Sequence, residues 1–365
     1  MPIGLFDTDT PMAPLRERLL DAAVRALDGG TFILGPEVDA FEREFADYLG
    51  VEHVVGVANG TDALTIALRS MGVGPGDEVV VPSFTFYASA EAIPPTGARP
   101  VFCDVDIDTM MVTADTVRAA LTPATKAVIA VHLFGNVAPV KDIEALGVPV
   151  LEDCAQAAGS RGPDGRPGAL GAAATFSFYP SKNLACLGDG GAIATSDDGV
   201  AEMARILRFH GSRDRSCWEF VGYNSRLDEI QAAFLRVLLP ELDRWSRGRM
   251  RAADHYAEAG LGELVTLPSP TAGAAAAWHL CVVRSQAVDE IAQALTAAGI
   301  GNRVYYRPPV HRHPAMAPYA AAIALQATDA LALSHLAIPI SPVFTRAQAD
   351  EVTRCVESAV AARAG

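Results

Sequence analysis

The feature that most constrains the fold of this chain is the regular alternation of short apolar runs with helical patterns. The runs are apolar at nearly every position, which is typical of parallel strands covered by helices on both faces. Seven of them predict strands, at 53–58, 78–82, 99–105, 126–134, 148–153, 173–178 and 191–195. Helical patterns lie between several of them, at 61–72 and 140–146 for example. We therefore predict an α/β fold with a largely parallel sheet.

The pattern changes after residue 211. Residues 226–260 form a long helical region with an expected kink near Pro240. This region has apolar positions that need cover, and a partner subunit could supply some of it; the positions are Ile230, Phe234, Leu235, Leu238 and Leu239. A strand pattern and two helical patterns follow, at 278–284, 288–299 and 345–364.

The chain of 365 residues is long enough for two domains. We expect a large domain over 1–250 and a smaller α+β domain over 251–365, with the N-terminal segment packing on the smaller one. The Pro- and Ala-rich stretch 267–277 predicts either a linker or a surface loop.

The charge of the chain excludes some partners. A formal net charge of −14 argues against binding nucleic acid or an anionic membrane. The sequence has no apolar run of membrane-spanning length and no N-terminal signal peptide, so we expect a cytoplasmic protein. Its six cysteines are scattered without a CxxC pair, which predicts reduced thiols and no zinc site.

Parallel sheets bind ligands at the carboxyl ends of their strands, so residues that follow strands are candidates. After the strand at 53–58, Asn59 and Gly60 predict a turn, and Thr61 or Asp62 is expected to open a helix. The free amides at a helix start can bind a phosphate. The alternative is an ordinary N-cap formed by Thr61 or Asp62.

Three further residues follow strands or stand close behind them. Asp153 ends an apolar strand, where it either caps a helix or pairs with a positively charged group. Lys182 lies five residues after Ser177, between an apolar run and a cluster of glycines. Pyridoxal phosphate chemistry requires a lysine for the Schiff base, an acid beside the pyridine nitrogen and a phosphate cradle. Asp153, Lys182 and the phosphate-binding turn after the first strand together favour pyridoxal phosphate as the cofactor.

With these residues in place, the chain resembles the DegT/DnrJ/StrS-type sugar aminotransferases. These are pyridoxal phosphate enzymes of the aspartate-aminotransferase fold, fold type I, in which a mostly parallel mixed sheet lies between helices. The resemblance runs from "GGTFILGPEVDAFEREFADYLG" to "YYRPPVHRHP". Between them stand, in order, "NGTDALTIAL", "GPGDEVVVPSFTF", "GARPVFCDVD", "TKAVIAVHLFG", "LEDCAQAAGS", "FSFYPSKNL", "GDGGAIAT" and "GYNSRLDEIQAA".

The resemblance implies a role for each matching residue. Lys182 would form the Schiff base, and Asp153 would pair with the pyridine nitrogen. The other implied cofactor contacts are the amides of Gly60, Thr61 and Asp62 with Ser177 at the phosphate, Phe86 on the ring, Gln156 at the ring hydroxyl, and Asn224 reaching the phosphate from the other subunit of a homodimer. From the residues alone, Phe86 could equally be a core side chain and Asn224 part of a turn.

The resemblance also implies substrate contacts. Tyr305 and His311 belong to a segment that approaches the sugar in relatives. Arg226, Arg303 and Arg307 are candidate counter-charges for a sugar diphosphate, with surface positions as the alternative. The i,i+2 histidines of "HRH" do not have typical zinc-ligand spacing, so we expect no metal.

The implied reaction moves an amino group from L-glutamate to a nucleotide-linked keto-sugar, giving an amino sugar for antibiotic or cell-surface glycan biosynthesis. The segments "NLACLGDGGA" and "NSRLDEIQAA" resemble enzymes of 3-keto sugars, which favours a dTDP-3-keto-6-deoxyhexose. A UDP-linked 3-keto sugar and a 4-keto-hexose are the alternatives. A sugar dehydratase is disfavoured, since that branch has histidine at the position of Lys182. A regulatory protein without catalysis is the alternative of another class.

Overall fold

The computed structural model describes residues 2–364, and its central element is a seven-stranded sheet. The strand order is β1-β7-β6-β5-β4-β2-β3, with β7 antiparallel to both of its neighbours and the other pairs parallel. All seven predicted strands are confirmed, with small shifts of their ends. They are β1 (His53–Val57), β2 (Glu78–Pro82), β3 (Arg99–Cys103), β4 (Thr125–Val131), β5 (Val150–Asp153), β6 (Ala173–Ser177) and β7 (Gly191–Thr195).

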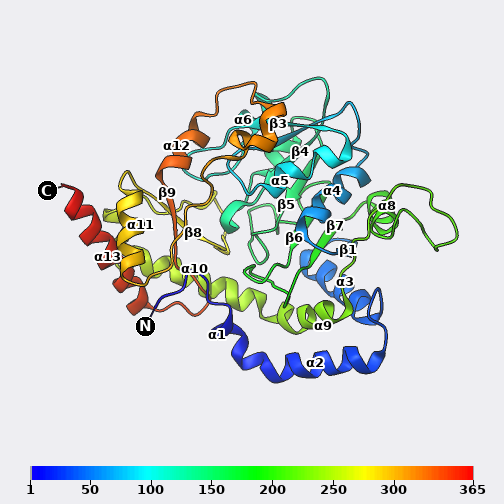
Figure 1. Ribbon diagram of the computed structural model, residues 1–365, viewed down its shortest axis with the longest axis horizontal. Helices are drawn as coiled ribbons and strands as arrows, with labels where there is room; N and C mark the ends of the chain where they lie inside the picture. The colour runs from blue at the N-terminus through cyan, green and yellow to red at the C-terminus, as the bar shows by residue number, and fades with distance from the viewer. Residues whose placement is uncertain (1, 365) are drawn as a thin grey trace.

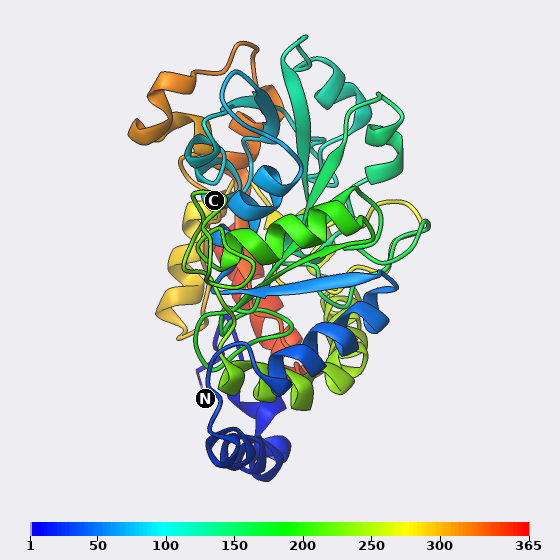
Figure 2. The same ribbon diagram turned by 90° about the vertical axis from the view of Figure 1, so that its right-hand side faces the viewer.

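Helices cover both faces of this sheet (Figures 1 and 2). Successive residues of a strand point to opposite faces: Val54 belongs to a buried cluster with α2, α3 and α9, while Val55 belongs to a cluster with α4 and α8. This double cover explains why the strands are apolar throughout. The helices are α2 (Arg16–Gly29), α3 (Pro36–Leu49), α4 (Gly60–Ser70), α8 (Asp198–Arg208) and α9 (Glu229–Leu238).

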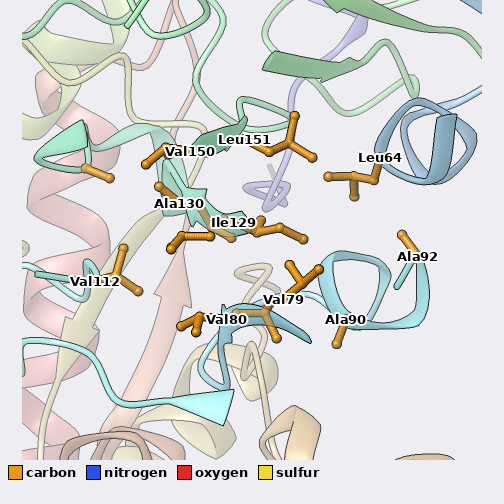
Figure 3. Packing of buried hydrophobic residues seen from close by; sticks show 14 of the residues in the cluster. Leu64, Val79, Val80, Ala90, Ala92, Val112, Ile129, Ala130, Val150 and Leu151 are labelled. Carbon is orange, nitrogen blue, oxygen red and sulfur yellow. The ribbon is translucent and has the colours of Figure 1, made fainter. Parts of the chain in front are cut away.

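The larger of these clusters fills the space between strands and short helices (Figure 3). Val79, Ile129 and Leu151 come from β2, β4 and β5 and are fully buried, and Leu64 reaches toward them from α4. Burying side chains of this size contributes about 1.5–3 kcal/mol each. The shorter helices of this half are α5 (Ala88–Glu91), α6 (Ala114–Arg118) and α7 (Val140–Glu144). The short helix α1 (Asp9–Met12) lies on the other side, next to α2 (Figure 1).

The long helical region is divided at Pro240, as predicted. A 3-10 turn, Leu239–Glu241, separates α9 from α10 (Leu242–Glu258). Most of the cover for its apolar positions comes from the chain itself. Leu235 and Leu238 are buried within the chain, because α9 packs against α2 and α3.

A smaller group of elements lies at the other end of α10 (Figure 1). It comprises β8 (Cys281–Arg284) paired antiparallel with β9 (His335–Ile338), together with α11 (Val288–Ala297) and α13 (Arg346–Ala364). A third buried cluster joins these elements to the second half of α10 and to Ile3. The helix α12 (Gln326–Ser334) packs instead on the larger cluster, to which its Leu331 belongs. The strand β9 was not predicted. Residue 250 lies inside α10, and the division of the chain there stays a prediction.

The stretch 267–277 contains no helix or strand and packs against the large sheet's loops. Asn136 Nδ2 donates to the carbonyl of Ser269 at 3.1 Å, and Arg161 pairs with Ala275 through the backbone. It is therefore a surface loop. Further 3-10 turns are η1 (Ala13–Leu15), η2 (Pro94–Thr96), η3 (Leu133–Gly135), η5 (Leu261–Glu263), η6 (Val310–Arg312) and η7 (Pro314–Tyr319). Among residues 2–364, no helix is both long and apolar enough to cross a membrane.

Candidate active site

A cavity of about 580 Å³ opens at the carboxyl edge of the sheet. It is lined by residues that follow β1, β2, β5 and β6, as the sequence predicted for a parallel sheet. The predicted site residues that line it are Gly60, Thr61, Asp62, Phe86, Asp153, Gln156, Ser177, Lys182 and Tyr305. Asn224, Arg226 and His311 are not among its lining residues in this chain.

One wall is the turn between β1 and α4. The helix begins at Gly60, and its N-cap is Asn59, whose Oδ1 accepts from the Asp62 amide at 2.8 Å. The alternative of a cap formed by Thr61 or Asp62 is thus wrong. Asparagine caps helices as well as threonine or aspartate does, and Asn59 comes first along the chain. The cap occupies the Asp62 amide, so the amides of Gly60 and Thr61 are the ones left free for an anion.

This turn lies against the end of β6. A Cβ placed on Gly60 would lie 2.8 Å from the Cβ of Ser177, so only glycine allows this approach. Gly191 of β7 is equally constrained, since its Cβ would lie 2.4 Å from the carbonyl oxygen of Asn59. The glycines therefore bring the Ser177 hydroxyl next to the helix N-terminus.

The carboxylate of Asp153 is buried at the end of β5 and faces the cavity. Its Oδ2 accepts a hydrogen bond from Ser89 Oγ at 2.7 Å, and its Oδ1 accepts from the Ala155 amide at 3.1 Å. Ser89 Oγ also lies 3.0 Å from Thr85 Oγ1. Nothing in "FTFYASAEA" distinguishes this serine from others, so its position beside Asp153 was not predicted.

Lys182 stands in the loop after β6 and lines the same cavity as Asp153. Its backbone amide donates to the carbonyl of Tyr179 at 2.8 Å, which fixes the loop. Burial lowers the pKa of Lys182 to about 8, although the Asp153 carboxylate opposes this shift. The chain has three lysines, and the other two, Lys126 and Lys141, are exposed.

Gln156 is held in one orientation beside the cavity. Its Oε1 accepts from the Phe134 amide at 2.6 Å, and its Nε2 donates to Tyr306 Oη at 3.0 Å. Burial raises the pKa of Tyr306 above its ordinary value, so its hydroxyl stays protonated. Tyr306 is a second lining residue that the sequence analysis missed, although it neighbours the predicted Tyr305.

The side chain of Phe86 is 54% exposed and lines the cavity, so the alternative of a core phenylalanine is wrong. Its ring centroid lies 6.0 Å from that of Tyr306. On another side, His279 stacks on Phe6 at 5.8 Å. Burial, with the charges of Lys182 and Arg249, lowers the pKa of His279 well below its ordinary value and keeps it neutral.

Five predicted residues have contacts elsewhere in the chain. Asn224 is exposed and pairs with Phe209, whose ring also receives the Arg226 guanidinium at 5.8 Å. His311 Nδ1 lies 2.6 Å from Ser83 Oγ. Arg303 lies over the ring of Tyr305 at 5.2 Å, whereas Arg307 donates to Ala332, Leu333 and Asp289. Arg307 is thus engaged away from the cavity.

A buried group of His132, Glu152 and Cys154 has potential metal ligands within 4.8 Å of one another. His132 Nε2 lies 2.9 Å from Glu152 Oε2, and His132 Nδ1 accepts from the Ala138 amide at 3.0 Å. The Glu152 carboxylate also accepts from three loop amides, those of Gly168, Leu170 and Gly171. These hydrogen bonds use the ligand atoms of His132 and Glu152, so the group fixes the loop after β5.

The residues present fit pyridoxal phosphate. The turn at Gly60 with Ser177 offers amide and hydroxyl donors to a phosphate. The buried Asp153 offers a carboxylate to a pyridinium nitrogen, and Lys182 offers an amine. A mixed sheet of this order that carries these groups at its carboxyl edge defines the class of pyridoxal phosphate enzymes of fold type I.

Comparison with known proteins narrows the class. Residues 14–357 match the DegT/DnrJ/EryC1/StrS aminotransferase family. A dTDP-3-amino-3,4,6-trideoxy-α-D-glucose transaminase of Streptomyces venezuelae is 44% identical over 97% of this chain and 95% of its own. A UDP-N-acetyl-3-dehydro-α-D-glucosamine 3-aminotransferase of Acidithiobacillus ferrooxidans is 43% identical over 95% of each chain.

A solved structure agrees with these relatives. The crystal structure of DesV from S. venezuelae, in complex with a ketimine intermediate, superimposes with a TM-score of 0.94 at 42% identity and covers 98% of both chains. The chain belongs to the DegT/DnrJ/EryC1/StrS aminotransferase family. The expectations of fold type I, of an aminotransferase and of pyridoxal phosphate as cofactor are confirmed.

Proposed function

We propose that this enzyme transfers the amino group of L-glutamate to a nucleotide-linked keto-sugar, and that the sugar is a dTDP-3-keto-6-deoxyhexose. The observation that carries the proposal is the meeting of Lys182, Asp153 and the Gly60–Ser177 turn in one cavity. The product would be an amino sugar for an antibiotic or a cell-surface glycan.

We assign the chain's own groups as follows. Pyridoxal phosphate, when bound, carries the amino group and withdraws electrons from the reacting carbon. Lys182 is the group that holds or moves a proton at the α-carbon of the donor, because a pKa of about 8 leaves part of it as free amine near neutral pH. Asp153 supplies the negative charge that keeps a ring nitrogen protonated.

The remaining residues that line the cavity would bind and orient the cofactor and the sugar. The amides of Gly60 and Thr61, with the Ser177 hydroxyl, would bind the phosphate, and Gln156 would lie at the ring hydroxyl. Phe86 would cover a ring face, and it excludes water there. Tyr305 also lines the cavity, and we assign it to the sugar.

The choice of sugar rests on the segments after Lys182 and after Asn224. The identities of 44% and 43% to a dTDP-sugar and a UDP-sugar enzyme are too close to separate the two nucleotides. The segment "NLACLGDGGA" favours the 3-keto position. A UDP-linked 3-keto sugar and a 4-keto-hexose are the competing substrates.

We also infer that the enzyme is a cytoplasmic homodimer with shared active sites. Asn224 stands on a loop that exposes 63% of Trp218 and 85% of Val221, which is more apolar surface than a loop usually leaves to water. A second copy would cover these side chains and receive Asn224 at its phosphate site. Arg226 and His311 are then candidates for the substrate from this or the other subunit.

A colour test distinguishes an enzyme from a regulatory protein that keeps the fold. The purified protein should be yellow, L-glutamate should bleach it, and the correct keto-sugar should restore the colour. The ratio of kcat/KM for dTDP- and UDP-linked 3-keto sugars then identifies the substrate. A protein that stays colourless with added pyridoxal phosphate would overturn the proposed function.

A further inference from the structure

The turn that follows β4 contains a residue in an unfavourable backbone conformation. Phe134, in the 3-10 turn η3, has a φ of 58° and a ψ of 11°, which place it in the left-handed region. This region is uncommon for residues other than glycine, because Cβ crowds the following carbonyl oxygen. Such residues persist only where the surrounding structure holds them, and they gather at functional sites. The contacts of Phe134 therefore decide what its conformation does.

Hydrogen bonds from other segments hold the carbonyl groups of this turn. The Phe134 carbonyl accepts from the Leu280 amide at 3.3 Å. The carbonyl of the following residue, Gly135, accepts from the Ala277 amide at 3.1 Å and from Ser160 Oγ at 2.8 Å. The turn is thus fixed against the segment that leads into β8, and the direction of the Phe134 carbonyl is set from outside the turn.

The ring of Phe134 is also held, because it is buried against two aromatic side chains. It stacks on Tyr306, with the ring planes 14° apart and the centroids 6.2 Å apart. It meets the ring of Phe84 edge-on, again with the centroids 6.2 Å apart. Both arrangements are favourable for aromatic pairs. Phe134 does not itself line the main cavity, so it can affect the chemistry there only through a neighbour.

That neighbour is Gln156, which lines the cavity. The Phe134 amide donates to Gln156 Oε1 at 2.6 Å. A backbone N–H can only donate, so the side-chain atom that faces it must be the oxygen, and Nε2 must point the other way. One N–H of Nε2 donates to Tyr306 Oη at 3.0 Å. Within residues 2–364 Nε2 makes no other hydrogen bond, so its second N–H is left for a group bound in the cavity.

We propose that Phe134 is a positioning residue for the cofactor: its left-handed φ aims the backbone amide at Gln156 Oε1, which turns Nε2 toward the ring hydroxyl of pyridoxal phosphate. The angle φ sets the direction of the N–H relative to the ring and the carbonyl of the same residue. Because both of these are held, a negative φ would aim the amide elsewhere. The inference rests on the proposed function, in which Gln156 lies at the ring hydroxyl, and adds the residue that orients it.

The test compares two isomeric side chains at this position, in the enzyme loaded with pyridoxal phosphate. Isoleucine has the same atoms as leucine, but it branches at Cβ and tolerates a positive φ poorly. The chain already holds Leu34 at a φ of 51°, whereas none of the described residues with a positive φ is β-branched. Phe134→Ile should therefore release Gln156, and Phe134→Leu should keep its orientation.

The measurement is the pH midpoint at which the yellow colour of each loaded variant titrates. Losing the Gln156 donor leaves more negative charge on the ring oxygen, which favours a protonated Schiff base. The midpoint should therefore rise by about one pH unit in Phe134→Ile, as for one lost hydrogen bond. Phe134→Leu should stay close to the wild-type midpoint. A defect in packing alone would affect the two isomers equally.

Gln156→Leu is the reference, because it removes the donor itself and should raise the midpoint at least as far as Phe134→Ile does. Phe134→Val, which is also branched at Cβ, repeats the test if the isoleucine variant does not fold. Equal midpoints in the Leu and Ile variants, with Gln156→Leu shifted, would overturn the positioning role alone. An unshifted Gln156→Leu would instead overturn the assignment of Gln156 in the proposed function, and the inference with it.

Discussion

The hydroxyl of Ser89 donates a 2.7 Å hydrogen bond to Oδ2 of the buried Asp153. Together with the Ala155 amide at Oδ1, it fixes both oxygens of the carboxylate at the end of β5. Ser89 does not directly follow a strand, because it lies in the short helix α5. It therefore acts as a positioning residue for the acid in the site.

Ser89→Ala should lower kcat about 10-fold, because a lost hydrogen bond to a buried charge is worth about 1.5–3 kcal/mol and only part of it reaches the transition state. The KM for L-glutamate should change little. Ser89→Thr keeps the hydroxyl and should restore most of the rate. An equal loss of kcat in the Ala and Thr variants would show that Ser89 acts only through packing. A changed affinity for pyridoxal phosphate in the Ala variant alone would support its role in positioning Asp153.

Asp153→Ala should leave the protein able to bind pyridoxal phosphate but lower turnover by several orders of magnitude. The ring nitrogen loses the charge that keeps it protonated. Asp153→Asn, which preserves shape without charge, should be similarly slow. Absorbance measures the cofactor content of each variant, and kcat is measured on the same samples. A near-normal kcat in either variant would refute the role of Asp153 as the charge partner of the ring nitrogen.

The lowered pKa of Lys182 predicts how fast cofactor-free enzyme takes up pyridoxal phosphate. Only the neutral amine reacts, so the uptake rate should rise with pH and level off above a midpoint of about 8. A lysine with an ordinary pKa would give a rate that still rises near pH 10. Stopped-flow absorbance measurements between pH 6 and about 10.5 locate the midpoint. A midpoint near the ordinary pKa of lysine would contradict the lowered pKa of Lys182.

Asn224 tests the shared site through mixed dimers of Lys182→Ala and Asn224→Ala chains. If Asn224 serves the partner's phosphate, one site of a mixed dimer carries both changes and the other carries neither. Activity should then recover toward half the wild-type rate per mixed dimer. If both residues act within one chain, each site keeps one defect and no recovery occurs. Mixed dimers that form without recovery would contradict the assignment.

Strand ends were predictable here because parallel strands bring their following residues to one edge, and Lys182 and Asp153 lie in one cavity as that rule requires. The helix cap at Asn59 was not predictable, because Asn, Thr and Asp cap helices almost equally well. Ser89 and Tyr306 were missed for another reason. Their partners Asp153 and Gln156 are distant along the chain, and no local pattern reports a contact formed by tertiary packing.

The packing of α9 shows the same limit of prediction from sequence. Its apolar positions were correctly predicted to need a partner surface, but α2 and α3 of the same chain provide it. Both helices have apolar stripes of their own, and sequence alone does not say which stripes meet. The chain also shows that exposed Phe86 and buried phenylalanines look alike in sequence.

We propose that Lys182 carries the cofactor, and mass spectrometry can identify the modified lysine directly. Borohydride reduction of the yellow enzyme should attach pyridoxal phosphate covalently to a single lysine, and peptide mapping identifies it among Lys126, Lys141 and Lys182. We expect the added mass on Lys182, with loss of activity, and no added mass in the Lys182→Ala variant. Label on Lys126 or Lys141 instead, or an active Lys182→Ala enzyme, would contradict it.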